Sequence, residues 1–267
     1  MEKQYAPLRL VSQRDKVTDD NRLGDSAKDF TEAGYAHALT LAQRSYEFAT
    51  FTSRPSSRHV LWRHDVDFSV HRALRLAVIE AEMGARSTYF MYPHSQFYNL
   101  LSDLVIPKAR GILELGHELG LHFDPTFYGG KLRGGELLAK IESERNLLTE
   151  LFGRPPAAIS FHLFGVLEEP APDDDVVAGM VNAYGRTIKS EYTYCSDSNG
   201  VWRHSRLFDV LEKAEEDRLH VLTHPEWWTP EAMAPRARLQ RCLDGQAAAV
   251  GRYYDELVDL HGRPNVR

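Results

Sequence analysis

The stretch Val60-Leu-Trp-Arg-His-Asp-Val-Asp-Phe68 decides how the rest of this chain can be arranged. It predicts a buried β-strand, because an apolar run leads directly into two carboxylates. Alternate side chains of a strand share a face, so Asp65 and Asp67 are expected to project together from its C-terminal end. Like charges this close repel each other unless a cation compensates them, which favours a metal ion at this place. The alternative is that Asp67 only caps the helix that follows.

Strands and helices alternate around this stretch. Apolar periodicity, glycine caps and proline breaks predict strands over 59–66, 87–92, 117–124 and 157–162, separated by helices over 70–83, 104–115 and 136–151. This order implies parallel strands with helices outside, in a barrel or a doubly wound sheet. Further along, the pattern predicts a short helix over 176–184, strands over 192–198 and 219–224, and helices over 207–216 and 236–260.

A single catalytic domain, 1–267, fits the length of 267 residues. Within it, residues 1–28 are polar and predict an irregular lead-in, and 30–58 predict a helix and short strand that extend the core. Residues 59–228 form the predicted barrel core, and 229–267 the C-terminal helix. No internal repeat marks a second domain.

Composition narrows the class of partner. The net charge is −6 and no run of basic residues occurs, which argues against a nucleic-acid partner. The sequence has no apolar run long enough for a membrane span and no secretion signal, so a cytoplasmic location is expected. Two cysteines make no disulfide framework, whereas twelve histidines offer many potential metal ligands. Oligomeric state is not indicated.

Polar side chains stand at the ends of four predicted strands, and these are Asp65 and Asp67, His122 and Asp124, His162, and His224. In a parallel barrel these ends open on one face, where enzymes of this architecture keep their active sites. Strand alternation turns His64 away from Asp65 and favours His122 over His117. Carboxylate and imidazole together suit zinc, with cobalt and nickel as alternatives.

Four segments resemble, in order, the motifs of the polysaccharide deacetylase-like (NodB-homology) superfamily, namely Arg63-His-Asp-Val-Asp, Gly116-His-Glu-Leu-Gly-Leu-His, Ser160-Phe-His and Leu222-Thr-His. The resemblance covers about 60–228, and the first two motifs with their spacing are its specific part. It implies an α/β fold, a distorted (β/α)7-type barrel with parallel strands and outer helices. It also implies a metal-dependent deacetylase.

The same resemblance implies roles by position. Asp65 is the expected catalytic base and Asp67 a metal ligand, while His122 is a second ligand and His224 the general acid. Asp197 and Trp202 are similar to a further motif, whose aspartate supports the acid and whose tryptophan forms a wall of the pocket.

Two positions depart from the family pattern. The family has a second histidine four residues after His122, where this chain has Thr126. His162 is the expected replacement as third ligand, with Asp124 as the runner-up. The family's base-orienting arginine is also missing from the third motif, and Arg63, on the same strand face as Asp65, is expected to do this instead. An ordinary ion pair is the alternative for Arg63.

Together these residues predict hydrolysis of an N-acyl group on an intracellular amino sugar, glycan precursor or related metabolite, with zinc as the expected cofactor and cobalt or nickel possible. Substrate contacts are expected from Asp124, Trp202, Trp227 and Tyr128, since aromatic rings stack on sugars, although packing at the barrel mouth is the alternative for the rings. Two other functions stay open. One is a hydrolase of the same fold acting on a non-sugar C–N bond, and the other is a catalytically degenerate barrel that only binds a ligand.

Overall fold

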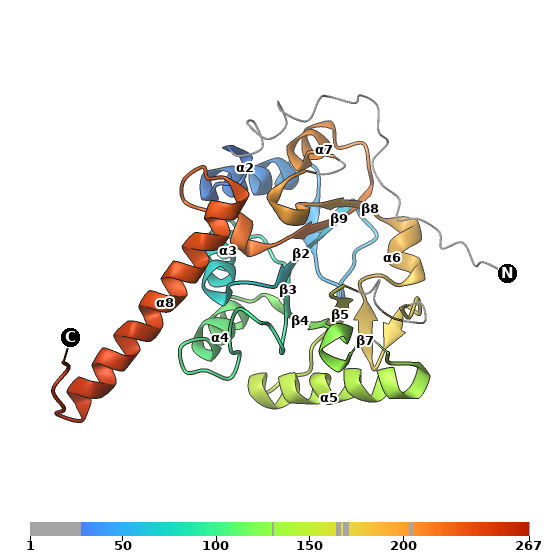
Figure 1. Cartoon of the computed structure of the whole chain (residues 1–267). Coiled ribbons are helices and arrows are strands. Elements are labelled where there is room, and N and C mark those ends of the chain that lie inside the picture. The colour runs from blue at the N-terminus through green and yellow to red at the C-terminus, as the bar shows by residue number, and fades with distance from the viewer. Residues whose placement is uncertain (1–27, 130, 164–166, 168–170, 203–204, 267) are drawn as a thin grey trace.

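The computed structural model of the chain describes residues 28–129, 131–163, 167, 171–202 and 205–266 (Figure 1). The predicted lead-in therefore lies almost wholly outside the described residues. The strands are β1 (Glu47–Ala49), β2 (His59–Val66), β3 (Thr88–Met91), β4 (Glu118–Phe123), β5 (Ala158–Phe161), β6 (Val176–Val177), β7 (Met180–Asn182), β8 (Thr193–Ser196) and β9 (Arg218–Thr223).

These strands form one sheet in the order β6-β7-β5-β4-β3-β2-β9-β8, with β1 beside the first half of β2. All neighbours from β7 to β8 are parallel, and only β6 pairs antiparallel, with β7. No pairing joins β6 to β8 among the described residues, so the curled sheet is a half-barrel. The prediction of a distorted, mostly parallel (β/α) barrel is confirmed.

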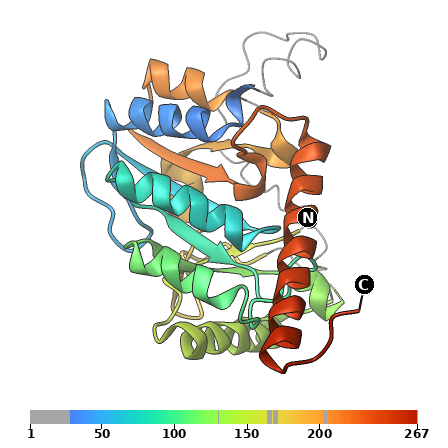
Figure 2. The same cartoon turned by 90° about the vertical axis from the view of Figure 1, so that its left-hand side faces the viewer.

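Two helices do not cover the outer face of the sheet: α6 (Arg186–Glu191), whose Ile188 packs with the inner residues Leu61 and Phe90, and α8 (Pro235–Leu260). The outer face is covered by α2 (Glu32–Gln43), α3 (Val70–Glu82), α4 (Ile106–Glu114), α5 (Gly134–Phe152) and α7 (Leu207–Lys213). Figure 2 shows α7, α2, α3, α4 and α5 stacked along that face, with α8 on the side towards which the strand arrows point. None of the helices in the described part of the chain has the length and apolar character that a membrane crossing requires.

The cap of α3 excludes one alternative reading of the opening motif. Ser69, not Asp67, is the N-cap residue, and its hydroxyl accepts a hydrogen bond from the Arg72 backbone N–H at 3.3 Å. A serine in this position satisfies one of the free N–H groups at the start of the helix. The Asp67 carboxylate is therefore not used as the cap of α3.

Apolar side chains fill both faces of the sheet. Outward-facing residues such as Trp62 pack under the helices, and inward-facing residues such as Phe51, Leu61 and Phe90 fill the half-barrel. Each fully buried side chain of this size stabilises the fold by about 1.5–3 kcal/mol. Gly120 makes room for the Phe90 ring, because a Cβ at this position would lie 2.6 Å from a ring carbon.

The predicted helix over 176–184 is wrong. The segment forms the antiparallel pair β6 and β7, joined by Ala178 and Gly179, whose φ angles are 49° and 76°. Two successive residues with positive φ are typical of the tight turn between hairpin strands, and a helix cannot contain them.

Candidate metal centre and active site

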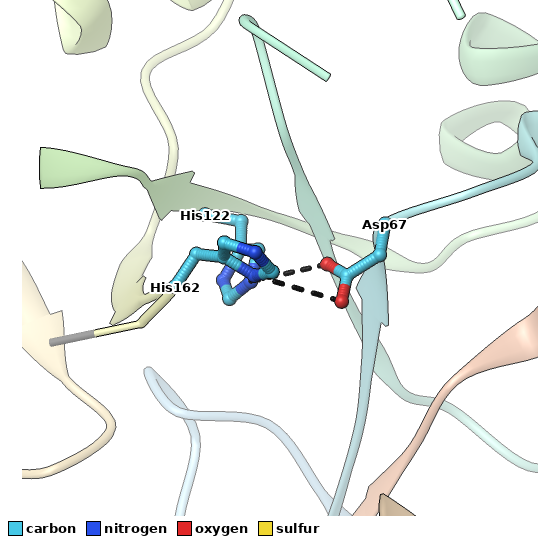
Figure 3. Close-up of side chains that lie close together, drawn as sticks. All are labelled: Asp67, His122 and His162. Atoms are coloured by element: carbon cyan, nitrogen blue, oxygen red, sulfur yellow. Dashed lines mark hydrogen bonds and ion pairs between the residues drawn. The ribbon is translucent and has the colours of Figure 1, made fainter. Parts of the chain in front are cut away.

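Three side chains that were predicted as metal ligands lie together at the carboxyl ends of their strands (Figure 3). Asp67 follows β2, His122 lies in β4, and His162 follows β5. His122 Nε2 lies 3.2 Å from Asp67 Oδ1, and His162 Nδ1 lies 3.6 Å from Asp67 Oδ2. One ligand atom from each residue lies within 4.8 Å of the others. Parallel strands bring these residues together because their carboxyl ends meet at one edge.

The donors of this group fit a divalent metal ion. One carboxylate and two imidazoles are a protein ligand set typical of catalytic zinc, which leaves a coordination position open. Asp67 Oδ1 is buried and receives no well-directed hydrogen bond from the described residues. Buried polar atoms are nearly always paired, and a bound ion would be a suitable partner for this oxygen, which lies 3.2 Å from His122 Nε2.

The electrostatics of the group also suit metal binding. Burial raises the pKa of Asp67, but the charge of His122, with those of His224 and His162, outweighs it and keeps this pKa well below its usual range. Burial and the charge of His122 lower the pKa of His162. Burial lowers the pKa of His122, but the negative charges of Asp65 and Asp67 outweigh it and raise this pKa. Since metal ions bind the ionised carboxylate and the neutral imidazole, binding at this group would release a proton from His122.

Asp124, the runner-up as third ligand, is otherwise engaged. It caps the short 3-10 helix Pro125–Tyr128, where its Oδ1 accepts hydrogen bonds from the Thr126 backbone N–H at 2.8 Å and the Thr126 hydroxyl at 2.7 Å. Its Oδ2 accepts a short hydrogen bond from the Tyr92 hydroxyl. Thr126, where the family has its second histidine, thus supports a cap, and His162 is the residue that lies with Asp67 and His122.

Asp65, the expected base, is held on both carboxylate oxygens. Arg63 Nη2 donates to Oδ2 at 3.1 Å, and Ser160 Oγ donates to Oδ1 at 3.3 Å. Arg63 is fully buried and also donates to the Tyr184 hydroxyl at 2.6 Å. The expected neighbourhood of Arg63 and Asp65 is therefore present, and Tyr184 fixes the guanidinium from its other side.

His224, the expected acid, is held by Asp197. Its Nδ1 donates to Asp197 Oδ1 at 2.6 Å, and the indole of Trp228 donates to Oδ2 at 3.0 Å. Burial lowers the pKa of His224, but the negative charge of Asp197 and this hydrogen bond raise it to about 10. The other nitrogen, Nε2, lies 3.9 Å from Asp67 Oδ2. A protonated imidazole therefore borders the group of Asp67, His122 and His162.

A cavity of about 370 Å³ opens beside these residues. This volume is within the usual range for small-molecule sites. Its wall includes Asp67, His162, Asp124, Trp227 and the stacked pair Phe68 and Phe97. Two of the predicted substrate contacts, Asp124 and Trp227, thus line a cavity that reaches the candidate metal centre.

The structure places the two other predicted substrate contacts elsewhere. Tyr128 donates a hydrogen bond to Glu144 at 2.8 Å, and Trp202 donates to Asp29 at 2.9 Å and stacks on Phe30 with ring centroids 4.7 Å apart. Neither is part of the described cavity wall. The contacts of Tyr128 and Trp202 therefore fit the alternative, in which these rings pack around the mouth of the barrel.

Ser160 and Trp228 contact the expected base and the partner of the expected acid, and the sequence predicted neither contact. Alternation places Ser160 on the same strand face as His162, so the sequence pattern contains a signal for this contact. The contact between Trp228 and Asp197 could not be predicted in this way, because no local periodicity relates these two residues.

No family model matches the chain, and no curated protein matches it. Solved structures do match. A mutant of a CE4 family pseudoenzyme with restored activity is 12% identical over 74% of this chain and 65% of that one, with a TM-score of 0.44. A peptidoglycan deacetylase from Bdellovibrio bacteriovorus is 16% identical over 76% of this chain and 54% of that one, with a TM-score of 0.43.

A family 4 acetyl xylan esterase from Clostridium thermocellum, in complex with a cobalt ion, is 13% identical over 77% of this chain and 92% of that one, with a TM-score of 0.37. The chain spans about two thirds of the pseudoenzyme mutant and about half of the Bdellovibrio bacteriovorus deacetylase. Identities and TM-scores this low leave the function to be argued from the residues of the site. These three structures are a mutant of a CE4 family pseudoenzyme, a peptidoglycan deacetylase and a family 4 acetyl xylan esterase.

Proposed function

We propose that this protein is a divergent, metal-dependent member of the polysaccharide deacetylase-like superfamily, with the whole chain as one catalytic domain. Its substrate is an N-acylated amino sugar, glycan precursor or related metabolite inside the cell, from which it removes the acyl group. One observation carries the proposal: a held carboxylate base and a protonated histidine border the same group of three metal-ligand side chains. Asp65 Oδ2 lies 3.7 Å from His122 Nδ1, and His224 Nε2 lies 3.9 Å from Asp67 Oδ2.

Asp67, His122 and His162 are the residues that hold the ion. When bound, a divalent ion such as zinc lowers the pKa of water to about 7 and polarises an acyl oxygen. The three residues would supply two neutral nitrogens and one negative oxygen, so a divalent ion held there would keep a net positive charge, which would favour a developing oxyanion.

Asp65 accepts the proton of the attacking water. Hydrogen bonds from Arg63 and Ser160 orient its carboxylate, so that it does not have to be positioned anew in each catalytic cycle. A base in this position typically contributes about 10²–10⁴-fold to the rate.

His224 donates a proton to the nitrogen that leaves. An amide nitrogen departs as an amine only if it is protonated, and Asp197 keeps His224 in the protonated form. The ring is held through Nδ1, which leaves the Nε2 proton facing the centre. A barrel that only bound a ligand would use neither this acid nor the base, which favours catalysis over the ligand-binding alternative.

The wall of the cavity supports a sugar substrate. Aromatic side chains at Phe68, Phe97 and Trp227 provide apolar faces of the kind on which sugar rings stack, and Asp124 adds a carboxylate. A non-sugar N-acyl amine is the competing substrate class, and a substrate panel separates the two.

Metal content and hydrolysis test the proposal together. Purified protein is stripped with a chelator, reconstituted with zinc, cobalt or nickel, and analysed for metal by elemental analysis. It is then assayed on N-acetylated amino sugars, chitooligosaccharides and simple N-acetyl amines. About one ion per chain and release of acetate are expected, with Asp65→Asn retaining the ion while the rate falls by about 10²–10⁴-fold.

Asp259→Asn is the matched control, because Asp259 is exposed on α8 and should leave both readouts unchanged. Wild-type protein that binds no ion after reconstitution would contradict the proposal. So would full activity in the Asp65→Asn variant.

A further inference from the structure

Ser160 lies between the expected base and an expected metal ligand. It is in β5 and fully buried. Its Oγ lies 2.7 Å from His122 Nδ1 and 3.3 Å from Asp65 Oδ1. A single hydroxyl group thus connects side chains from β2 and β4, strands that are not neighbours in the sheet.

The direction of the two hydrogen bonds follows from chemistry. An ionised carboxylate can only accept, so the Ser160 hydroxyl must donate its hydrogen to Asp65. The lone pairs of Oγ are then available to accept, and the His122 Nδ1–H is the donor within reach. The order is therefore His122 Nδ1–H to Ser160 Oγ–H to Asp65 Oδ1.

This order selects one tautomer of His122. With hydrogen on Nδ1, a neutral imidazole presents the lone pair of Nε2, the atom that lies 3.2 Å from both Asp67 Oδ1 and His162 Nδ1. A hydrogen bond on the second ring nitrogen is the usual way in which proteins orient a metal-binding histidine and increase its basicity. Ser160 supplies that bond here.

We infer that Ser160 is a positioning residue that presents His122 Nε2 to the metal ion and orients Asp65 through the same hydroxyl group. This rests on the proposed function. The inference goes beyond the proposed function, because a single side chain would couple metal affinity to the orientation of the base. Since the site of the hydroxyl is fully buried, removing it leaves His122 Nδ1–H and Asp65 Oδ1 each with one partner fewer.

The test measures zinc affinity of the apoprotein by competition with a chromophoric chelator, which needs no substrate. Ser160→Ala should weaken zinc binding by about 10–100-fold. Ser160→Thr keeps the hydroxyl and should restore most of the affinity. Ser160→Cys is measured as well, because cysteine is close to serine in volume and a folding defect in one variant then does not decide the result. This variant should also bind zinc more weakly than wild type.

Ser87→Ala is the matched control. Ser87 is also fully buried and bonded to a carboxylate and a histidine, with Oγ 2.6 Å from Glu80 Oε2 and 3.2 Å from His117 Nδ1, but on the outer face of the sheet. It should lose stability and keep its zinc affinity.

The outcomes separate this inference from the proposed function. Wild-type affinity in Ser160→Ala overturns the inference alone, and so does an equal loss in Ser160→Ala and Ser160→Thr, which would mean that shape rather than the hydroxyl matters. Wild-type protein without measurable zinc binding overturns the proposed function and the inference with it. Weak binding in Ser160→Ala, restored in Ser160→Thr, supports the inference.

Discussion

Two polar clusters lie on opposite faces of β2, and both combine carboxylates with histidines. The inner cluster consists of Asp65, Asp67, His122, His162 and His224. The outer cluster consists of Tyr35, His64, Glu80, Ser87, Tyr89 and His117. The two clusters use neighbouring parts of the chain. Outer His64 is adjacent to inner Asp65, and outer His117 directly precedes β4, which carries inner His122. The clusters differ in how completely their hydrogen bonds are satisfied.

The outer cluster is closed. Glu80 is fully buried, and its two oxygens accept hydrogen bonds from His64 at 2.8 Å, Ser87 at 2.6 Å and Tyr89 at 2.7 Å, as well as from Tyr35. The helix α3, which carries Glu80, is joined in this way to β2 through His64, to β3 through Tyr89 and to α2 through Tyr35. Since each partner is occupied, the cluster has no capacity for a ligand and its role is stability.

The inner cluster is open. Asp67 keeps one oxygen without a well-directed donor, its side chain is 19% exposed, and a cavity lies beside it. A partly satisfied polar group is unfavourable unless something else completes it. The two clusters are alike in composition, so the unmade hydrogen bond and the adjoining cavity, rather than the residue types, favour the inner cluster as the metal site.

The largest effect is expected from Asp67→Ala. Removing an outer partner of a ligand already costs about 10–100-fold in affinity, so removing the ligand itself should cost more than about 100-fold. Activity should fall with zinc binding, which equilibrium dialysis and an acetate-release assay measure on the same sample. If Asp67→Ala bound zinc as tightly as wild type, the inner cluster would be no different from the outer one.

His224→Gln should separate catalysis from metal binding within the inner cluster. Loss of a general acid lowers kcat by about 10²–10⁴-fold, while zinc content stays at the wild-type level because His224 is not among the ligands. The readouts are kcat and elemental analysis. Loss of zinc in this variant would instead place His224 among the ligands.

Glu80→Gln should show the opposite pattern. Breaking a buried ion pair from one side costs about 3–5 kcal/mol, because the other partners stay buried without compensation. The free energy of unfolding, measured with urea, should fall by about this amount, while the zinc affinity of the folded protein stays unchanged. A loss of zinc affinity without a loss of stability would reverse the assignment of the two clusters.

The outer cluster also predicts a pH dependence. Burial raises the pKa of Glu80, but the charge and hydrogen bond of His64, with His117 and Ser87, lower it to about 2 from an ordinary 4.5. A depressed pKa means that the stabilisation is present above about pH 4.5 and is lost as the pH falls towards 2. The difference in unfolding free energy between wild type and Glu80→Gln should therefore shrink over that window. A difference that is constant with pH would contradict this.

The smallest effect is expected at the cavity wall. Phe97 is 37% exposed and stacks on Phe68. An aromatic contact is worth about 0.5–1.5 kcal/mol, so Phe97→Ala should raise KM by about 2–10-fold and leave kcat and zinc affinity nearly unchanged. Leu101→Ala, which removes another exposed apolar side chain outside the cavity wall, is the control. Equal changes of KM in Phe97→Ala and Leu101→Ala would mean that Phe97 does not contact the substrate.

The sequence by itself determined the alternation of strands and helices, the parallel arrangement of the strands, and which face of β2 carries Asp65, while the choice of a barrel over a doubly wound sheet came from the motif resemblance. The first three follow from local periodicity, because strand alternation and helix caps depend on residues close in the chain. It failed over 176–184, where apolar residues fit a helical spacing and the turn at Ala178 and Gly179 decided otherwise.

Only the tertiary structure decided which polar residues meet. Residues such as Asp67, His122 and His162 are far apart in the chain, and the order of β2, β4 and β5 in the sheet sets their distances. The same holds for Ser160, which touches Asp65 across the barrel, and for Tyr128, which turns to Glu144 rather than to the cavity. Sequence patterns report which face a side chain takes, whereas the partner across the sheet depends on strand order and register, which no local pattern encodes.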